Sequence, residues 1–535
     1  MILIKEETNE KRILTMLLAG VLSVTLLAGC GGSKEPAANT EETTEQTSES
    51  TQADAGEKHL NMAYHSEIKN LDPATSSWET KRIGVGENLF RINDDLQLEP
   101  WLADSYEQVD DLTWKITLKD GIKFSNGKEL TGEAAKACLD RTCEKNQRAV
   151  TMLNIASIEA EGQTLTITTN DVNAALLNNL ADLVGTILDV DTLEGENAIP
   201  VGTGPFVIAS MEEGKMELVA NKDYWDGVPK LDSVTIKYIL DGNAQAMALD
   251  SGEIDLAFQL PTENITQFMD SDKITVTSNT GSRSQILYFD YTNEFLADHS
   301  VREAISSAID RETFANVINK GNSEAATAIF PVSFSYGKVP GVSYDVEHAK
   351  KLLADAGYTD SDGDGVLDKN GKALSFKLYT YGEHGTLLAT FAEAIQASLK
   401  EIGIATDIQT NDYDAHTNIL KAGGFDLALN SYIMAPVADP QYFCDIMLRT
   451  GADYNYGKYS DEKVDELIAQ LDKEFDVAKR EELAKEIQAV EVEDCGFFTL
   501  GHLKYQIAAN NKVSGYSTQA TEAYILTKDT DIAAE

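Results

Sequence analysis

The stretch at residues 201–258 decides the fold of this chain, with VGTGPF at 201–206 and KDYWDGVPKLDSVTIKYILDGNAQAMALDSGEIDLAF at 222–258. Its hydrophobic pattern predicts a strand, a short helix and a second strand, at residues 233–240, 243–251 and 254–258. A connection this short returns the chain parallel to itself, and ligands of open α/β sheets bind beyond the carboxyl ends of such strands. We therefore expect an α/β protein whose ligand site lies at these strand ends.

Length and charge limit the remaining choices. A chain of 535 residues is too long for a single ordinary core, so we expect at least two domains. A formal net charge of -44 argues against DNA or RNA as a partner, because nothing would neutralise the phosphates. We interpret the charge as a solvated acidic surface, with attraction of cationic solutes as the alternative.

The N-terminus predicts export and anchoring. An apolar run at residues 13–28 follows Lys11 and Arg12 and is too short to span a bilayer, so residues 1–29 are interpreted as a signal peptide. Leu27-Ala28-Gly29-Cys30 resembles the bacterial lipobox, in which the cysteine is acylated. Residues 30–57 would then be the lipid-bearing Cys30 and a disordered acidic linker. This predicts an extracytoplasmic protein, anchored to the outer face of the cell membrane by an N-terminal lipid.

Motifs of the common enzyme classes are absent from the sequence. It contains no G-x-S-x-G elbow, no H-E-x-x-H and no G-x-x-x-x-G-K-[ST], and its seven histidines form no metal-ligand cluster. We predict that the chain is not an enzyme; an extracellular hydrolase is the alternative from another class. Of the cysteines after Cys30, a disulfide between Cys444 and Cys495 is permitted but not required.

One acidic loop resembles a calcium site. Asp360, Asp362, Asp364 and Asp368 occupy positions 1, 3, 5 and 9 of a calcium loop, but Gly371 stands at position 12, where a bidentate glutamate is needed. The alternative is a tight turn rich in Asx hydrogen bonds. We expect no resident cofactor, with calcium at this loop as the exception to be tested.

Seven segments, in order and spacing, resemble the family 5 extracellular solute-binding proteins, which bind peptides, nickel chelates and opines for ABC importers. They are WLA (101–103), KFSNGKELTGEAAK (123–136), VGTGPF (201–206), NKDYWDGVPKLDSVTIKYI (221–239), SGEIDLAF (251–258), VREAISSAIDRE (301–312) and HAKKLLADAGY (348–358). The resemblance implies an α/β fold of two lobes that close on a ligand, with an extra small subdomain.

The same resemblance implies a domain map and partners. Lobe 1 would comprise residues 58–97, 201–285 and 506–535, the small subdomain 98–200, and lobe 2 residues 286–505. An ABC permease and ATPase complex would receive a small solute from a protein that we expect to be a monomer.

Within this family a few residues of the cleft set the class of ligand, so we compare those positions with this sequence one by one. In peptide-binding relatives an aspartate grips the peptide ammonium, and Pro436 stands at that position here. The loop at residues 435–440 resembles that of nickel-binding members. Asn146-Gln147-Arg148 resembles the stretch that supplies an arginine to the carboxylates of a nickel chelate, a role that suits a guanidinium. The alternative for Arg148 is a surface arginine paired with a neighbouring acid.

Other positions depart from the nickel-binding pattern. The second chelate-binding arginine has no counterpart in residues 180–188, and Tyr432 stands near the expected tryptophan. We add His65 and Trp78 as candidate ligand contacts; their alternatives are a polar residue at a lobe edge and core packing. The resemblance therefore favours a nickel or other metal chelate, with an oligopeptide or dipeptide as the alternative ligand.

Overall fold

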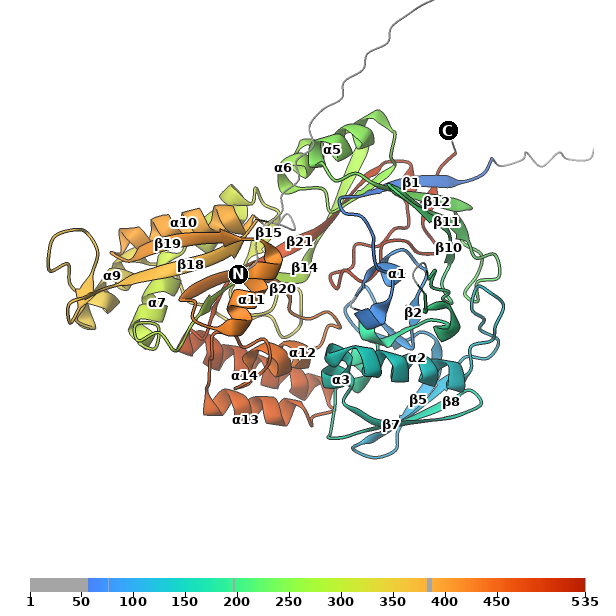
Figure 1. The fold of residues 1–535 in the computed structure, drawn as a ribbon, viewed down its shortest axis with the longest axis horizontal. Helices are drawn as coiled ribbons and strands as arrows, with labels where there is room; N and C mark the ends of the chain where they lie inside the picture. The colour runs from blue at the N-terminus through green and yellow to red at the C-terminus, as the bar shows by residue number, and fades with distance from the viewer. Residues whose placement is uncertain (1–55, 76, 196–197, 383–386, 535) are drawn as a thin grey trace, which may run out of the picture. The chain divides into compact units, whose positions relative to one another are not determined.

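A mixed sheet of eleven strands organises the computed structural model, which describes residues 56–75, 77–195, 198–382 and 387–534 (Figure 1). Residues Ala55–Glu535 form one compact unit. The predicted signal peptide, Cys30 and nearly all of the linker lie outside the described residues.

The predicted strand, helix and strand are confirmed as β12 (Ser233–Tyr238), α5 (Gly242–Ser251) and β13 (Leu256–Phe258). Both strands run parallel to β1 (His59–Tyr64), which lies between them. Asp241 begins α5 because its carboxylate accepts the amide hydrogen of Ala244 at 2.8 Å. The crossover therefore returns the chain parallel to itself, as its shortness predicted.

The strand order of the large sheet is β10-β11-β12-β1-β13-β21-β14-β20-β18-β19, with β15 paired to β21. Its remaining strands are β10 (Phe206–Glu212), β11 (Lys215–Ala220), β14 (Ile274–Phe289), β15 (Ser323–Ala325), β18 (Ser375–Tyr381), β19 (Ala405–Asn411), β20 (Leu427–Ile433) and β21 (Phe498–Asn510).

Two long strands, β14 and β21, connect the two halves of this sheet. The first half of β14 pairs with the end of β21 beside β13, and its second half pairs with β20. The register between β14 and β21 shifts between Thr280 and Ser284. We call residues 280–284 the crossing point, because the chain passes there from one half of the sheet to the other.

Helices cover both faces of the half that contains β20. On one face lie α7 (His299–Ala308), α9 (Val346–Asp355) and α10 (Leu388–Glu401), and on the other α11 (Tyr413–Ala422), α13 (Glu462–Leu471) and α14 (Val477–Asp494). Alternate residues of β14 serve the two cores, with Leu287 in one and Ile286 in the other. Helix α13 buries one face, at Val464, Leu467 and Leu471.

A separate four-stranded antiparallel sheet forms most of the region between β4 (Leu98–Pro100) and β9 (Thr186–Ile187). Its order is β5-β6-β8-β7, with β5 (Ala103–Gln108), β6 (Thr113–Leu118), β7 (Ile155–Glu161) and β8 (Thr164–Thr169). Helices α2 (Gly132–Lys145), α3 (Gln147–Leu153) and α4 (Leu176–Asn179) share a hydrophobic core with this sheet. The predicted domain boundaries stay predictions.

Short elements complete the fold: α1 (Glu79–Arg82), α6 (Thr262–Ile265), α8 (Arg311–Thr313), α12 (Gln441–Phe443), β2 (Glu87–Asn88), β3 (Phe90–Ile92), β4 (Leu98–Pro100), β9 (Thr186–Ile187), β16 (Asp368–Lys369), β17 (Lys372–Ala373), β22 (Val513–Ser514), β23 (Asp531–Ile532) and the single-turn segments η1 (Pro73–Thr75), η2 (Leu183–Gly185), η3 (Val190–Thr192), η4 (Thr266–Phe268), η5 (Phe314–Ile318) and η6 (Cys444–Leu448).

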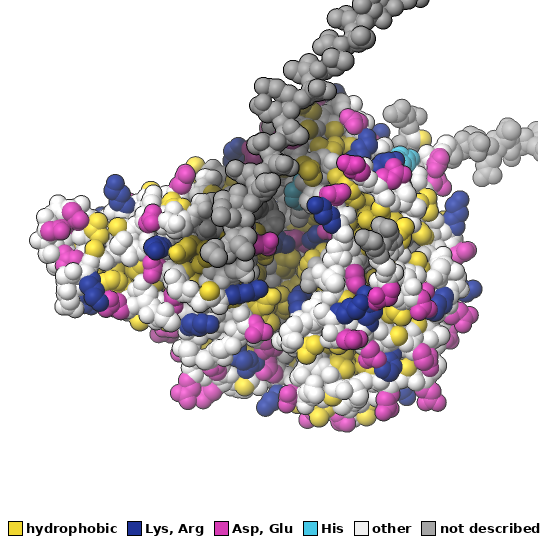
Figure 2. Space-filling model, in the orientation of Figure 1, with side chains coloured by type: hydrophobic (Ala, Val, Ile, Leu, Met, Phe, Trp, Pro, Cys, Tyr) yellow, Lys and Arg dark blue, Asp and Glu magenta, His cyan; other side chains and the backbone are white. Residues whose placement is uncertain are grey.

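Three surface and chemical features complete the description. Cys444 and Cys495 are both free thiols, so the permitted disulfide is not formed. Within the described ranges, every helix is too short or too polar to cross a bilayer. Figure 2 shows Asp and Glu side chains spread among Lys and Arg over the visible face.

Candidate functional site

Two guanidinium groups lie over the ring of Trp78. Its ring centroid is 5.8 Å from the guanidinium carbon of Arg82 and 5.7 Å from that of Arg148. Trp78 immediately precedes α1, whereas Arg148 lies on α3. The fold thus brings together two of the four ligand residues that the sequence predicted, from segments 70 residues apart.

Arg148 has partners within the chain. Its Nη2 donates to Oδ2 of Asp182 at 2.8 Å, and its guanidinium lies 5.0 Å from the ring of Tyr442. The arginine side chain is 19% exposed and that of Asp182 is fully buried. Burial lowers the pKa of Arg148, but the charge of Asp182 opposes this and the net pKa rises, so the arginine stays cationic. The structure shows the pairing with an acid that the alternative expects, but in a mostly buried place and not at the surface; the role of Arg148 as a ligand contact stays a prediction.

Lys81 is a buried cation behind this pair. Its Nζ donates to the carbonyl oxygen of Ala181 at 2.6 Å and lies 5.0 Å from the ring centroid of Tyr524. Burial lowers its pKa to about 8; Asp182 opposes the shift and Arg148 adds to it. Lys81 therefore loses its proton near pH 8, where lysines at the surface stay protonated.

A third guanidinium joins Arg82 through Glu522. The carboxylate of Glu522 accepts from Arg283 Nε at 3.3 Å and Nη2 at 3.2 Å, and lies 3.6 Å from Arg82 Nη2. Arg283 lies at the crossing point, on the strand that links the halves of the sheet. We call Arg82, Arg148 and Arg283 the arginine cluster. Sequence reasoning missed Arg82 and Arg283, because neither lies in a motif of ligand residues.

The carboxyl ends of two parallel strands lie against this cluster. Phe258, the last residue of β13, has its ring 5.4 Å from the guanidinium carbon of Arg82. Tyr64, the last residue of β1, packs against Phe258 with ring centroids 5.1 Å apart. Arg82 therefore lies at the position at which open α/β sheets bind ligands.

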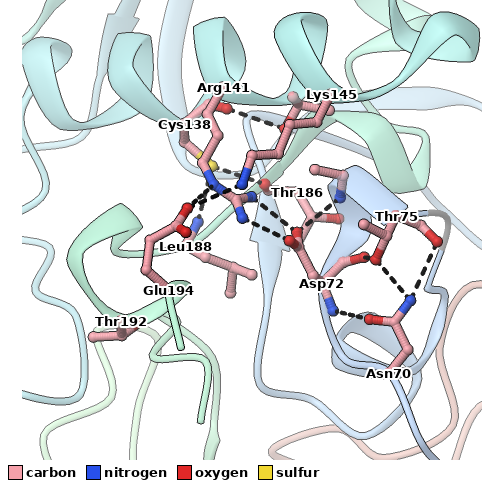
Figure 3. A network of polar contacts seen from close by, with 12 residues as sticks. Asn70, Asp72, Thr75, Cys138, Arg141, Lys145, Thr186, Leu188, Thr192 and Glu194 are labelled. Atoms are coloured by element: carbon pink, nitrogen blue, oxygen red, sulfur yellow. Dashed lines mark hydrogen bonds and ion pairs between the residues drawn. The ribbon is translucent and has the colours of Figure 1, made fainter. Parts of the chain in front are cut away.

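A polar network holds the segment before Trp78 in place (Figure 3). Arg141 of α2 donates from Nη1 and Nη2 to the two carboxylate oxygens of Asp72, at 3.0 and 2.7 Å. Asn70 donates to Thr75, and the hydroxyl of Ser77 donates to the carbonyl oxygen of Asn70 at 2.7 Å. A two-bond arginine–carboxylate pair fixes orientation as well as distance, so the helix that leads to Arg148 also positions Trp78.

The glycines of VGTGPF serve packing. A Cβ at Gly202 would lie 2.0 Å from the carbonyl oxygen of Val85, so only glycine fits. Between the two glycines, Thr203 donates to the buried carboxylate of Glu87 at 2.7 Å. Glu87 also accepts hydrogen bonds from Trp101, Tyr224 and Trp225. Its carboxylate therefore links three of the quoted motifs.

A cavity of about 1230 Å³ lies beside the crossing point. Lys81, Glu87 and Trp101 line one part, and Asn279, Thr280 and the C-terminal segment 515–520 line another. The segment 519–526 lines this cavity at Gln519, Ala520, Tyr524 and Leu526, and it also carries Glu522, the partner of Arg283.

The other two predicted ligand residues have different surroundings. Tyr432 is paired in register with Ser284, and its hydroxyl accepts from Asn430 at 3.2 Å while its ring packs against Tyr454. His65 follows the last residue of β1 and is partly exposed. Their role as ligand contacts stays a prediction.

The acidic loop places three carboxylates together. Asp360, Asp362 and Asp364 each have an oxygen within 4.8 Å of the others, and all three side chains are exposed. The carboxylate of Asp368 accepts from the amide and the hydroxyl of Ser361. Backbone amides of Gly363 and Gly365 donate to Asp360, as the turn interpretation expects. Calcium binding here stays a prediction.

Two sheet halves joined by long crossing strands, with arginines around a tryptophan at the strand ends, define an α/β binding protein. The chain belongs to the bacterial extracellular solute-binding proteins, family 5, whose middle region matches residues 97–455. This confirms the resemblance, and with it an extracytoplasmic protein and the two-lobed α/β fold.

Several relatives align with most of this chain. The nickel-binding protein NikA of Staphylococcus aureus is 33% identical over 89% of this chain and 94% of its own. Its structure with Ni(L-His)2 covers 89% of this chain and 100% of its own, with a TM-score of 0.76. The oligopeptide-binding protein AppA of Bacillus subtilis is 27% identical over 95% of this chain and 96% of its own. A nickel ABC transporter structure from Bacillus halodurans, 29% identical, covers 89% and 100%, with a TM-score of 0.75.

Proposed function

We propose that this chain is the solute receptor of an ABC importer and that its arginine cluster holds a metal chelate with carboxylate groups. One observation carries the proposal: Arg82 and Arg148 both lie over the ring of Trp78, and Arg283 shares the carboxylate of Glu522 with Arg82. Guanidinium groups recognise carboxylates through paired donors and keep their charge. A 33% identical relative named as nickel-binding supports a nickel complex over other chelates.

The position of the cluster suits capture by closure. Arg148 and Asp182 precede the crossing point, while Tyr442 follows it and contacts the same guanidinium. A second contact also joins a residue before the crossing point to a residue after it: Asn178 donates to the carbonyl oxygen of Val437 at 3.0 Å. A solute bound here would favour the closed arrangement to the extent that it binds that arrangement more tightly.

A peptide is the second candidate ligand. The 1230 Å³ cavity exceeds the usual 300–1,000 Å³ of small-molecule pockets, and relatives include an oligopeptide-binding protein. Its walls carry aromatic rings, from Trp101 and Tyr224, beside charged groups. These features would accommodate an extended chain better than a compact complex.

Native mass spectrometry with metal analysis of residues 55–535 as purified tests the proposal. Nickel or cobalt with a small organic chelator supports it, and a bound peptide would replace it with the second candidate. Isothermal titration with Ni(II) and two equivalents of L-histidine gives the matched measurement in solution. Turnover of any peptide or glycoside would contradict a purely binding role and favour the hydrolase alternative.

The proposal extends to anchoring and partners. Cys30 would carry the lipid that holds the protein on the outer face of the membrane, and a permease and ATPase complex would accept the solute. The function needs no resident cofactor. Metabolic labelling with a fatty-acid analogue tests the anchor, with Cys30→Ala as the matched control that should lose the label.

A further inference from the structure

A small cavity lies in the half of the large sheet that contains β20, among residues that take no part in the arginine cluster. Its volume is about 20 Å³, which suits one particle of the size of a water molecule but not the four oxygens of phosphate or sulfate. Its walls come mainly from α7, α8, α14 and the start of β21, and they include Ser306, Arg311, Glu491, Cys495, Phe498 and Thr499. Of the residues that line it, Arg311, Glu491 and Cys495 are the ones that can carry a charge.

Arg311 reaches this cavity without an acid as its partner. Its Nε donates to the carbonyl oxygen of Thr499 at 2.9 Å and its Nη1 to that of Val342 at 2.8 Å, and both acceptors are neutral. In the part of the chain that the structure describes, no carboxylate oxygen lies within 4.0 Å of its nitrogens. The guanidinium has more N–H donors than these two bonds use. Because Arg311 is partly exposed, a small ion can reach these donors from solvent.

The other arginines between residues 286 and 505 all contact acids. They are Arg302 with Asp494, Arg449 with Asp472 and Arg480 with Asp439, at nitrogen–oxygen distances of 3.2, 2.6 and 2.6 Å. Burial lowers the pKa of Arg311 to about 10, and the charge of Glu491 opposes the shift, so Arg311 is a cation at neutral pH. Arg311 is therefore the arginine of this region whose charge no contacting acid balances.

Glu491 lines the same cavity and is neutral at pH 7. The residue is 3% exposed, and its carboxyl group accepts from the amide of Phe497 at 3.0 Å. Burial raises its pKa to about 8; the Phe497 amide and Arg311 oppose the shift, and the charge of Asp494 adds to it. Below pH 8 the cavity therefore combines the positive charge of Arg311 with a protonated carboxyl group that can donate a hydrogen bond.

The other ionisable groups around Glu491 leave this balance unchanged. Burial raises the pKa of the Cys495 thiol to about 12, and it raises the pKa of Tyr291 and Tyr459 above the usual value, so all three stay neutral. The carboxylate of Asp494 is paired with Arg302.

A charge that is partly removed from water is costly unless a counter-charge lies beside it. A monatomic anion would supply that counter-charge, with guanidinium N–H groups and the protonated carboxyl group as its donors. A water molecule in the same place would leave the charge unbalanced. We propose that this cavity binds a halide ion, such as chloride, between Arg311 and the protonated carboxyl group of Glu491. Halide binding and ionisation of Glu491 then exclude each other, because both place a negative charge beside Arg311.

Thermal melting in chloride tests the proposal. The protein is melted in sodium chloride and in sodium gluconate of equal ionic strength, at about pH 6 and about pH 9, on either side of the pKa of Glu491. Chloride should raise the melting temperature above that in gluconate by at least about 2 °C at the lower pH, and by less than half as much at the higher pH. Glu491→Gln cannot ionise, so its chloride shift should persist at the higher pH.

Arg311→Gln removes the cation and should lose the shift. Arg449→Gln is the matched control that should keep it, because Arg449 contacts two acids and does not line the cavity. Bromide-soaked crystals of wild-type protein should give an anomalous peak beside Arg311. Absence of that peak overturns the inference, as does a chloride shift that Arg311→Gln retains; if Arg311→Gln does not fold, the peak alone decides. A wild-type shift that is equal at both pH values overturns the coupling to Glu491. Solute binding enters none of these measurements, so failure here leaves the proposed function untouched.

Discussion

Replacing Arg148 with alanine isolates the buried charge pair beneath Trp78. The variant leaves the carboxylate of Asp182 fully buried, with the amide of Val184 as a remaining donor at 3.2 Å. Two unit charges about 4 Å apart interact by about 4 kcal/mol at an effective dielectric constant of about 20. Breaking such a pair on one side typically costs about 3–5 kcal/mol, because the other charge stays buried.

We therefore expect Arg148→Ala to lower the free energy of unfolding by about 3–5 kcal/mol. The double variant Arg148→Ala/Asp182→Asn should recover part of this loss, because the uncompensated carboxylate is gone while buried Lys81 loses the opposing charge of Asp182. Lys81 responds as well, since Arg148 lowers its pKa and removal of Arg148 should raise it.

Urea denaturation of wild-type, single-variant and double-variant proteins measures these differences. A single-variant loss below about 0.5 kcal/mol, the range of ordinary surface substitutions, would refute the reasoning. Ligand titration on the same proteins separates binding from stability. If Arg148 contacts the solute, the variant also loses about 1.5–3 kcal/mol of binding free energy, the range for hydrogen bonds to charged groups.

Three further predictions concern other sites. Arg141→Lys keeps the charge but loses the two-bond geometry with Asp72, so the free energy of unfolding should fall by about 1–2 kcal/mol, measured in urea; equal stability would contradict the anchoring role. Burial raises the pKa of Glu491 in the folded protein to about 8, from 4.5 in the unfolded chain. The contribution of Glu491 to the free energy of unfolding is therefore fully present below pH 4.5 and is lost as the pH rises to 8. Glu491→Gln should flatten that dependence, by up to about 1.4 kcal/mol per pH unit, which thermal melts at several pH values detect; parallel curves would exclude it. Asp362→Asn should abolish any terbium luminescence at the acidic loop, and a signal that is unchanged would exclude calcium there.

Local patterns in the sequence were sufficient for much of the scaffold. The alternation at residues 233–240 and the capping aspartate at Asp241 specify a strand and a helix start through contacts within a few residues. The order of the motifs was sufficient to identify the family. One motif residue, Gly202, is required because the backbone of Val85 approaches it closely. Arg148 was predicted as a ligand contact because it lies in a stretch that resembles a family motif, whereas Trp78 was added as a candidate outside the quoted motifs.

The arginine cluster could not be read from the sequence, because its members are separated by up to about 200 residues and share no spacing. Arg82 becomes a cluster residue only where the ends of β1 and β13 meet α1, and Arg283 only where β14 crosses between the sheet halves. Glu522 joins them because a C-terminal segment returns to the crossing point. The sequence by itself determined the strand–helix–strand unit at residues 233–258 and the family, since these depend on patterns within short segments and on the order of those segments. Only the tertiary structure decided which charges meet, because electrostatic interaction depends on distance in space and on burial rather than on position along the chain.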